Sequence, residues 1–247
     1  LNLLNEIDGR NQLIAHAEGI EAHFAMPKLK FPKMWEALSN EHILVMEEIT
    51  HPTLEDHLEA GTFTWPDMLE LFRIHGAFMF GLGTFHGDLH PGNAMMDDQG
   101  NFLFIDTGAI CNAPEHVRNA LFGFFYFLAK GELKNAFDAM LTMAAVRPTG
   151  KTLDTYYASM NELYDGFVGT SVSEVSLTEQ MMKTVRAAVL AGCAFGEEAF
   201  PIIRSLMYMD GMVLKGHPSV DLISSMGPYL DEFSVLIDPN SIIQDAV

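Results

Sequence analysis

Basic residues are scarce in this sequence. Lysine and arginine together number 14, against 33 aspartate and glutamate residues, so the formal net charge at pH 7 is −19. A surface of this sign repels nucleic acid and anionic lipid headgroups. We therefore expect no nucleic-acid partner, and we expect a nucleotide to bind only where Mg²⁺ bridges carboxylates and phosphates.

Cysteines and long apolar runs are also rare. The two cysteines, Cys111 and Cys193, match no metal-binding spacing and indicate free thiols in a reducing compartment. No apolar run is long enough to span a bilayer, because the best candidate, residues 68–85, is interrupted by Glu70 and Arg73. We therefore expect no transmembrane segment in this chain and a cytoplasmic location, with peripheral attachment to a membrane left open.

The first residue is Leu and no signal peptide follows it, so we expect a fragment or a processed product. Hydrophobic residues make up 49% of the sequence, which predicts a folded globular protein. Apolar spacing predicts a helix over residues 5–24, and two strand-like runs at 33–38 and 42–47 predict an antiparallel hairpin. A further helix is expected to begin at Thr64, the predicted N-cap, and to end at the glycines of residues 81–83.

The second half of the sequence predicts mainly helices. Short apolar strands at residues 94–96 and 102–105 flank a turn at 97–100. Glycine and proline then divide the remainder into six predicted helices, at residues 115–130, 132–146, 152–167, 174–194, 198–214 and 219–236. The sequence therefore predicts an α+β fold with a mostly α-helical C-terminal part.

Three polar residues in the non-helical part carry the chemistry. Asp88 and Asn93 lie in one Gly- and Pro-containing loop, and Asp106 follows the next predicted strand. Asn93 comes five residues after Asp88, and Asp106 comes 13 residues after Asn93, the offsets of the kinase pattern H-x-D-x-x-x-x-N followed by D-x-G. Phosphoryl transfer needs a carboxylate near the acceptor and two oxygen ligands for Mg²⁺, and this set supplies all three.

Each of these residues, taken singly, fits a simpler role. An isolated Asp or Asn in such a loop is usually a turn residue. His86 and His90 suggest a metal site, but on a Pro-Gly loop they share no helix face, and we expect His86 to brace the loop by hydrogen bonding. The joint spacing favours the kinase pattern over these alternatives.

The loop of residues 84–93 resembles the catalytic loop of the UbiB-type atypical kinases, proteins tied to ubiquinone biosynthesis and isoprenoid-lipid metabolism. Three further segments agree in order: Glu6-Ile7-Asp8 resembles the E-x-D motif of that family, residues 31–49 its strand pair and hinge, and residues 209–230 its C-terminal helices. The resemblance implies a protein-kinase-like fold, with a partial N-lobe at residues 1–50 and a helical C-lobe at residues 51–247.

The resemblance also implies the roles of individual residues. Asp88 would be the catalytic carboxylate, and Asn93 and Asp106 the ligands of Mg²⁺. On the nucleotide side, the resemblance implies that Met46 is the gatekeeper, that the backbone of Glu47 and Ile49 meets the adenine edge, and that Glu6 serves the E-x-D motif beside the ATP site.

The sequence departs from the kinase pattern in three places. The phosphate-binding loop, the strand lysine and the K-x-G-Q extension of the family are missing, and Lys28, Lys30 and Lys33 are expected to face solvent instead. Gln12 occupies the position expected for the glutamate that pairs with that lysine, and an amide cannot form this ion pair. Thr107 replaces the Phe of D-F-G.

We therefore expect a Mg²⁺-dependent ATP-binding atypical kinase or ATPase of quinone or isoprenoid-lipid metabolism, with lipid or quinone-biosynthesis proteins as further partners. The alternatives are a nucleotide-binding pseudokinase or scaffold, and a small-molecule phosphotransferase of the aminoglycoside-kinase type. An aspartic protease would need a second Asp-Thr-Gly segment and a β-rich scaffold. The apolar run at residues 122–128 is expected to pack in the core, with a lipid-facing patch as the alternative.

Overall fold

The structure, a computed structural model, describes residues 2–22 and 24–244. The chain folds into two compact units, residues 1–112 and residues 113–247. All seven predicted site residues belong to the first unit. The predicted division into an N-lobe of residues 1–50 and a C-lobe of residues 51–247 differs from this division after residue 112, and it stays a prediction.

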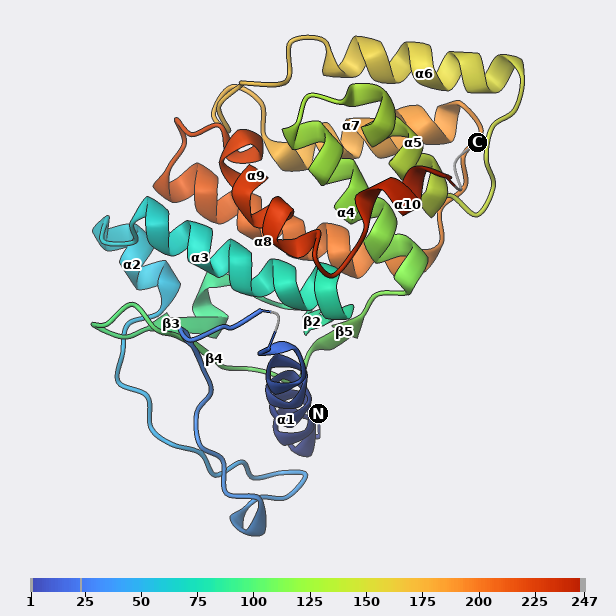
Figure 1. The fold of residues 1–247 in the computed structure, drawn as a ribbon. Helices are drawn as coiled ribbons and strands as arrows, with labels where there is room; N and C mark the ends of the chain where they lie inside the picture. The colour runs from blue at the N-terminus through green and yellow to red at the C-terminus, as the bar shows by residue number, and fades with distance from the viewer. Residues whose placement is uncertain (1, 23, 245–247) are drawn as a thin grey trace. The chain divides into compact units, whose positions relative to one another are not determined.

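The first unit contains three α-helices and five short strands within its described residues (Figure 1). Their bounds in chain order are α1 (Leu4–Ile20), β1 (Leu29–Lys30), α2 (Leu54–Ala60), α3 (Trp65–Gly76), β2 (Thr84–His86), β3 (Ala94–Met96), β4 (Phe102–Phe104) and β5 (Ile110–Asn112). Three single-turn pieces complete it: the 3₁₀ helices η1 (Glu36–Leu38) and η3 (Pro91–Asn93), and the π-helical turn η2 (Ala77–Leu82).

The strands form two small sheets. In the first, β4 lies in the middle, antiparallel to β3 and parallel to β1. In the second, β2 pairs antiparallel with β5, with Phe85 opposite Cys111. The Asp88 loop follows β2, and the Asp106 loop lies between β4 and β5. The pairing of β2 with β5 therefore holds the ends of these two loops together.

The helix predicted to begin at Thr64 is confirmed as α3. The Thr64 side chain accepts a hydrogen bond from the Asp67 backbone, and Asp67 reciprocates, which forms a capping box. The helix continues into η2 and stops at Gly83, whose φ of 75° suits a residue without a Cβ atom. The same capping pattern, Thr53 with Asp56, begins α2, a helix that the apolar spacing did not predict.

The predicted hairpin of residues 33–47 is only partly correct. Antiparallel bridges join Met34 to Met46 and Asn40 to Ile43. Residues 36–38, however, form η1 instead of a strand, and Leu38 stays 62% exposed. The alternation of apolar residues was misleading there, since Trp35 and Leu38 stay exposed and do not form the buried face that a strand would need.

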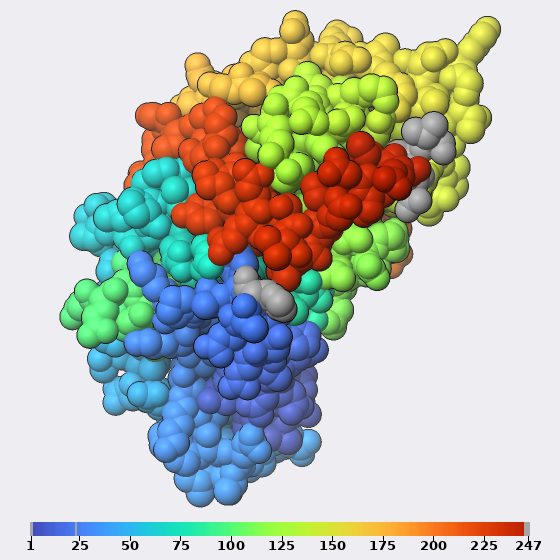
Figure 2. All heavy atoms as spheres, in the orientation of Figure 1, coloured from blue at the N-terminus to red at the C-terminus, as the bar shows by residue number. Residues whose placement is uncertain are grey.

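The second unit is helical. Its elements are α4 (Glu115–Ala129), α5 (Leu133–Met143), α6 (Lys151–Tyr164), α7 (Leu177–Leu190), the 3₁₀ turn η4 (Glu197–Ala199), α8 (Phe200–Gly216), α9 (Leu222–Phe233) and α10 (Pro239–Gln244). Six of these match the predicted helices, and α10 was not predicted. α4 packs against α5, α9 and α10, and Figure 2 shows α9 and α10 in red closing over the green atoms of this unit.

Burial settles the alternative for residues 122–128. Phe122, Phe124, Phe125, Phe127 and Leu128 are all buried on α4, so the apolar run packs in the core and a lipid-facing patch at this place is wrong. Within the described residues, no helix combines the length and the apolar character needed to cross a bilayer.

Candidate active site

The loop that carries Asp88 is anchored by a buried histidine. His86 ends β2 and is only 1% exposed. Its Nε2 donates to the backbone oxygen of Ile105 (2.9 Å), and its Nδ1 accepts from the backbone N–H of Asp88 (3.2 Å). His86 therefore joins the residue before Asp106 to Asp88, as the bracing role predicted for it requires, and both of its ring nitrogens make hydrogen bonds.

The protonation state of His86 supports this assignment. Burial lowers its pKa, although the hydrogen bond to Ile105 and the charges of Asp106 and Asp88 act in the opposite direction. A neutral ring can accept from one N–H group while donating to one carbonyl group, which is the pattern observed.

Asn93 is fixed on the same loop. Its Nδ2 donates to the backbone oxygen of Asp88 (2.9 Å) and lies 3.5 Å from Oδ2 of the same residue. Its backbone oxygen accepts from the N–H group of Ile105 at 3.0 Å. Because the amide nitrogen is held by Asp88, the amide oxygen is the atom left to act as a metal ligand.

Asp106 has an unusual backbone conformation. Its φ of 53° makes it the only non-glycine residue with positive φ among the described residues. Such a conformation is disfavoured for residues with a Cβ atom and persists where the surroundings impose it. The surroundings here are the first turn of α1.

Two hydrogen bonds attach the residues after Asp106 to α1. The Thr107 hydroxyl donates to the backbone oxygen of Glu6 (2.7 Å), and the Gly108 N–H group donates to Oε2 of Glu6 (2.9 Å). A Cβ atom on Gly108 would lie 2.5 Å from Oε1 of Glu6, so a larger residue here would displace the Glu6 carboxylate from this contact. We call Thr107, Gly108 and the Glu6 groups that they contact the α1 clamp.

The α1 clamp places two carboxyl groups side by side. Burial raises the pKa of Glu6, and the charge of Asp106 and a side-chain hydrogen bond with it raise that pKa further, while the hydrogen bonds from Gly108 and Thr107 act to lower it. No ion pair between a lysine or arginine and Glu6, Asp88 or Asp106 exists in the described part of the chain. The site thus concentrates negative charge that a cation would neutralise.

The residues predicted on the nucleotide side lie elsewhere in the first unit. Met46 forms an antiparallel β-bridge with Met34, and the N–H group of Glu47 donates to the backbone oxygen of Lys33 at 2.8 Å. Among described residues, the carbonyl group of Glu47 and the N–H group of Ile49 make no backbone hydrogen bond, which leaves both for a ligand. No described contact joins these three residues to Asp88, Asn93 or Asp106, although Pro52 and Thr53, just beyond them, pair with β3, which follows Asn93.

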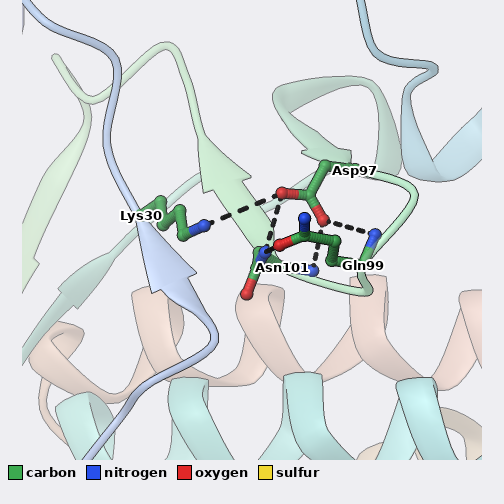
Figure 3. Close-up of polar contacts among 4 residues, drawn as sticks. All are labelled: Lys30, Asp97, Gln99 and Asn101. Carbon is green, nitrogen blue, oxygen red and sulfur yellow. Dashed lines mark hydrogen bonds and ion pairs between the residues drawn. The ribbon is translucent and has the colours of Figure 1, made fainter.

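The turn between β3 and β4 holds the loop of Asn93 and the loop of Asp106 in register (Figure 3). Oδ1 of Asp97 accepts from the N–H groups of Gln99 and Asn101, both at 2.9 Å, and its Oδ2 accepts from Nδ2 of Asn101 at 2.7 Å. Lys30 of β1 lies 3.8 Å from Oδ2 and is half exposed. Partial desolvation acts to raise the pKa of Asp97, but the hydrogen bonds from Asn101 and Gln99 and the charge of Lys30 lower it overall.

The donor set fits Mg²⁺ bound together with phosphates and not an all-protein metal site. No group of three or more His, Cys, Asp or Glu side chains within the described residues is arranged to hold a metal. Mg²⁺ is commonly bound by one or two protein oxygens plus substrate phosphates and water. The amide oxygen of Asn93 and the carboxylate of Asp106 would provide the protein oxygens.

Sequence reasoning missed two contributors to this site. The clamp role of Thr107 was not predicted, because its partner is a backbone atom about a hundred residues away. The turn at residues 97–100 was predicted, but the hydrogen bonds by which the Asp97 side chain holds it were not, although an Asp shortly before Gly and Asn is a pattern that offers side-chain-to-backbone hydrogen bonds.

Known proteins of the UbiB type are similar to this chain in sequence. The chain is 21% identical over 240 residues to "Probable protein kinase UbiB" of Pasteurella multocida, covering 94% of this chain and 45% of that protein. It is 25% identical over 172 residues to "Protein ACTIVITY OF BC1 COMPLEX KINASE 3, chloroplastic" of Arabidopsis thaliana, covering 67% of this chain and 23% of that protein. The chain therefore spans less than half the length of these relatives.

A solved structure is similar in fold. "The complex structure of Rv3197-erythromycin from Mycobacterium tuberculosis" matches with a TM-score of 0.52 and 15% identity, covering 88% of this chain and 56% of that one. The family described as the ABC1 atypical kinase-like domain matches residues 1–140, which is more than half of the chain and includes every predicted site residue. The chain thus has a kinase-like α+β fold and belongs to the ABC1 atypical kinase-like family, the UbiB type of atypical kinase.

Proposed function

We propose that this chain provides the Mg²⁺-dependent ATP site of an atypical kinase or ATPase that acts in quinone or isoprenoid-lipid metabolism. The observation that carries the proposal is the connection of Asp88, Asn93 and Asp106 through His86 and the backbone of Ile105. The names of the relatives support the kinase-like role, and the resemblance of the Asp88 loop to that of the UbiB-type kinases supports the link to quinones.

Each residue has a separate task in this proposal. Asn93 and Asp106 hold Mg²⁺, which when bound offsets the charge of the β- and γ-phosphates. Asp88 accepts the proton of the attacking hydroxyl group or water. The free carbonyl group of Glu47 and N–H group of Ile49 receive the adenine edge, with Met46 beside them, and Glu6 holds the Asp106 loop in place.

A nucleotide-binding scaffold is the second candidate. Gln12 is exposed on α1 at the position expected for the partner of the phosphate-binding lysine, and an amide cannot form that ion pair. A scaffold would bind the nucleotide through the same residues without turnover.

Calorimetry with ATP tests the site itself. The protein in its full natural length is titrated in MgCl₂ and in EDTA, beside Asp106→Asn and the matched control Asp98→Asn, which changes an exposed acid on the β3–β4 turn. We expect binding only with Mg²⁺, weakened at least about tenfold in Asp106→Asn and unchanged in Asp98→Asn. Failure of the unaltered protein to bind would refute the nucleotide site.

Turnover separates the enzyme from the scaffold. Asp88→Asn is expected to keep Mg²⁺-dependent binding while losing phosphate release or transfer, since the proton acceptor alone is removed. Binding without turnover in the unaltered protein would identify the scaffold. The quinone content of cells in which Asp106→Asn replaces the native chain tests the metabolic assignment.

A further inference from the structure

An apolar groove of about 540 Å³ is lined by residues of α7 and α8 in the second unit. Apolar side chains from both helices line it, together with one arginine: Met182, Val185, Phe200, Ile203, Met207 and Arg204. We call this surface the α7–α8 groove. It has no part in the proposed nucleotide site.

The side chains of the groove are of the kind that this protein otherwise buries. Phe200 is 65% exposed and Met182 is 54% exposed, whereas the largest fully buried side chains of the chain are mostly phenylalanines. Single exposed apolar residues are ordinary, but a contiguous concave set marks a binding surface. Methionine is common at such surfaces because its flexible thioether adapts to a partner.

The shape of the apolar surface fits a helix better than a compact ligand. Along α8, Phe200, Met207 and Leu214 recur every seven residues, and Leu214 is 46% exposed. At about 1.5 Å per residue this stripe runs for roughly 21 Å. Met182 and Val189 repeat the same spacing on α7, and Met182 lines the groove with Phe200 and Met207. A groove lined by apolar residues of two helices is a common docking place for a third, amphipathic helix.

Gly211 lies on the same stripe, between Met207 and Leu214. It is exposed, and a Cβ atom at this position would meet nothing within 4 Å. Glycine within a helix costs up to about 1 kcal/mol relative to alanine. Packing within the described chain gives no reason for it, whereas close approach of a partner's backbone would.

Two arginines beside the groove indicate which charge a partner would carry. Arg204 lines the groove, and Arg186 lies on the same face of α7 as Met182 and Val189, being four residues after one and three before the other. Glu179, which is three residues before Met182 on α7, pairs with Lys183 (2.6 Å), so Arg204 and Arg186 bring positive charge to this surface in a chain of 14 basic and 33 acidic residues. We propose that the α7–α8 groove binds an amphipathic helix of a partner protein whose apolar stripe is flanked by acidic residues.

Two other occupants fit less well. A second copy of the chain would present the same arginines to their counterparts and carries a net charge of −19, so both the local and the overall charges repel. An anionic bilayer would meet the same net charge and would face a concave surface instead of a protruding one.

The test uses two synthetic helical peptides of about 18 residues that share one Leu/Met stripe and differ only in flanks of Glu or Lys. Fluorescence anisotropy with the full chain is expected to show binding of the Glu-flanked peptide alone. Met207→Asp should weaken the binding of this peptide at least about tenfold. Val235→Asp, which also introduces Asp at an exposed apolar residue (73% exposed, after α9), should leave the binding unchanged. Arg204→Glu should shift the preference toward the Lys-flanked peptide.

Several outcomes would overturn the proposal. These are no binding of either peptide, equal binding of both, sedimentation of the free chain as a dimer that Met207→Asp dissociates, or binding to phosphatidylglycerol vesicles that Met207→Asp abolishes. Hydrogen exchange provides a test on the unaltered protein, since the Glu-flanked peptide should protect amides of α7 and α8 and leave α6 unaffected. Nucleotide binding in the same samples is read separately, so failure here is distinguishable from failure of the ATP site.

Discussion

The hydroxyl group of Thr107 donates a hydrogen bond to the backbone oxygen of Glu6 across 2.7 Å, and the Thr107 side chain is fully buried. This contact joins the first turn of α1 to the residue directly after Asp106. Thr107 occupies the place that Phe has in the D-F-G pattern. The Thr107 hydrogen bond thus stands where the Phe of D-F-G would make apolar contacts. It helps to hold Asp106 in its left-handed backbone conformation.

Thr107→Val should destabilise the protein. The substitution removes the hydroxyl group and the part-buried hydrogen bond that it donates to the carbonyl group of Glu6, which costs about 0.5–1.5 kcal/mol in the free energy of unfolding. Urea unfolding measures the change. Thr155→Val is the control, because the Thr155 hydroxyl bonds to a carbonyl group of its own exposed helix, and its effect should stay within about 0.5 kcal/mol. Equal effects of the two variants would contradict the role of the α1 clamp.

Glu6→Gln should change how stability depends on pH. The folded state raises the pKa of Glu6 above its ordinary value of 4.5, chiefly by burial and next by the charge of Asp106. The protonated form therefore favours folding, and this contribution is full below pH 4.5 and is lost as pH rises through the raised value. Glutamine keeps the acceptor for Gly108 but cannot ionise, so the variant should escape this loss.

The measurement is the urea midpoint from pH 4.5 to 7.5 in metal-free buffer, and this range begins at the ordinary pKa of Glu6. The midpoint of Glu6→Gln should rise relative to that of the unaltered protein as pH increases. Glu18→Gln, at an exposed position of the same helix, should run parallel to the unaltered protein. Parallel curves for Glu6→Gln as well would contradict a raised pKa of Glu6 in the folded protein.

Sequence reasoning was most successful for features that depend only on residues close to one another in the chain. The capping box at Thr64 and the turn at residues 97–100 appear in the structure as predicted, because each depends on residues within four positions of one another. It failed at β2 and β5, which have three residues each and owe their pairing to the fold and not to any periodicity. The missed helix α2 had a readable signal, the Thr53 and Asp56 pair, but its seven residues are too few for an apolar period to stand out.

The candidate site shows the same division. Spacing placed Asp88, Asn93 and Asp106 on adjoining loops, and the structure joins those loops through His86. The left-handed conformation of Asp106 and the pairing of its carboxyl group with Glu6 depend on where α1 packs. No pattern within one segment encodes a contact between residues that are far apart in the chain.

Asp210→Asn should destabilise the second unit. Asp210 of α8 is 3% exposed, and its carboxylate accepts from the N–H groups of Leu177 (3.1 Å) and Thr178 (3.0 Å) and from the Ser176 hydroxyl (2.7 Å). It therefore caps the N-terminus of α7 from another helix. Asparagine would turn an NH₂ group toward donors, and we expect a loss of about 2–4 kcal/mol in the free energy of unfolding.

The control for this prediction is Asp154→Asn, which makes the same change in the first turn of α6, where the side chain is exposed. Its effect should stay below about 1 kcal/mol, the usual size of an exposed helix-dipole interaction. Guanidinium unfolding followed by circular dichroism reports both. If Asp210→Asn were as mild as the control, the buried cap would not contribute to stability.

Two glycines on α1 give opposite predictions for one substitution. A Cβ atom on Gly9 would overlap the backbone oxygen of Thr107 and lie 2.9 Å from Cγ1 of Ile110, whereas a Cβ atom on Gly19 would meet nothing within 4 Å. Gly19→Ala should therefore stabilise the protein by about 0.5–1 kcal/mol through helix propensity alone. Gly9→Ala gains the same propensity but forces α1 away from the residues after Asp106, so the net change should be destabilising, and Mg²⁺-dependent ATP binding should weaken with it. Thermal and urea unfolding of the two variants, with calorimetry on each, would separate packing from propensity. A stabilised Gly9→Ala variant would mean that α1 does not pack against Thr107 and Ile110 as closely as the structure places it.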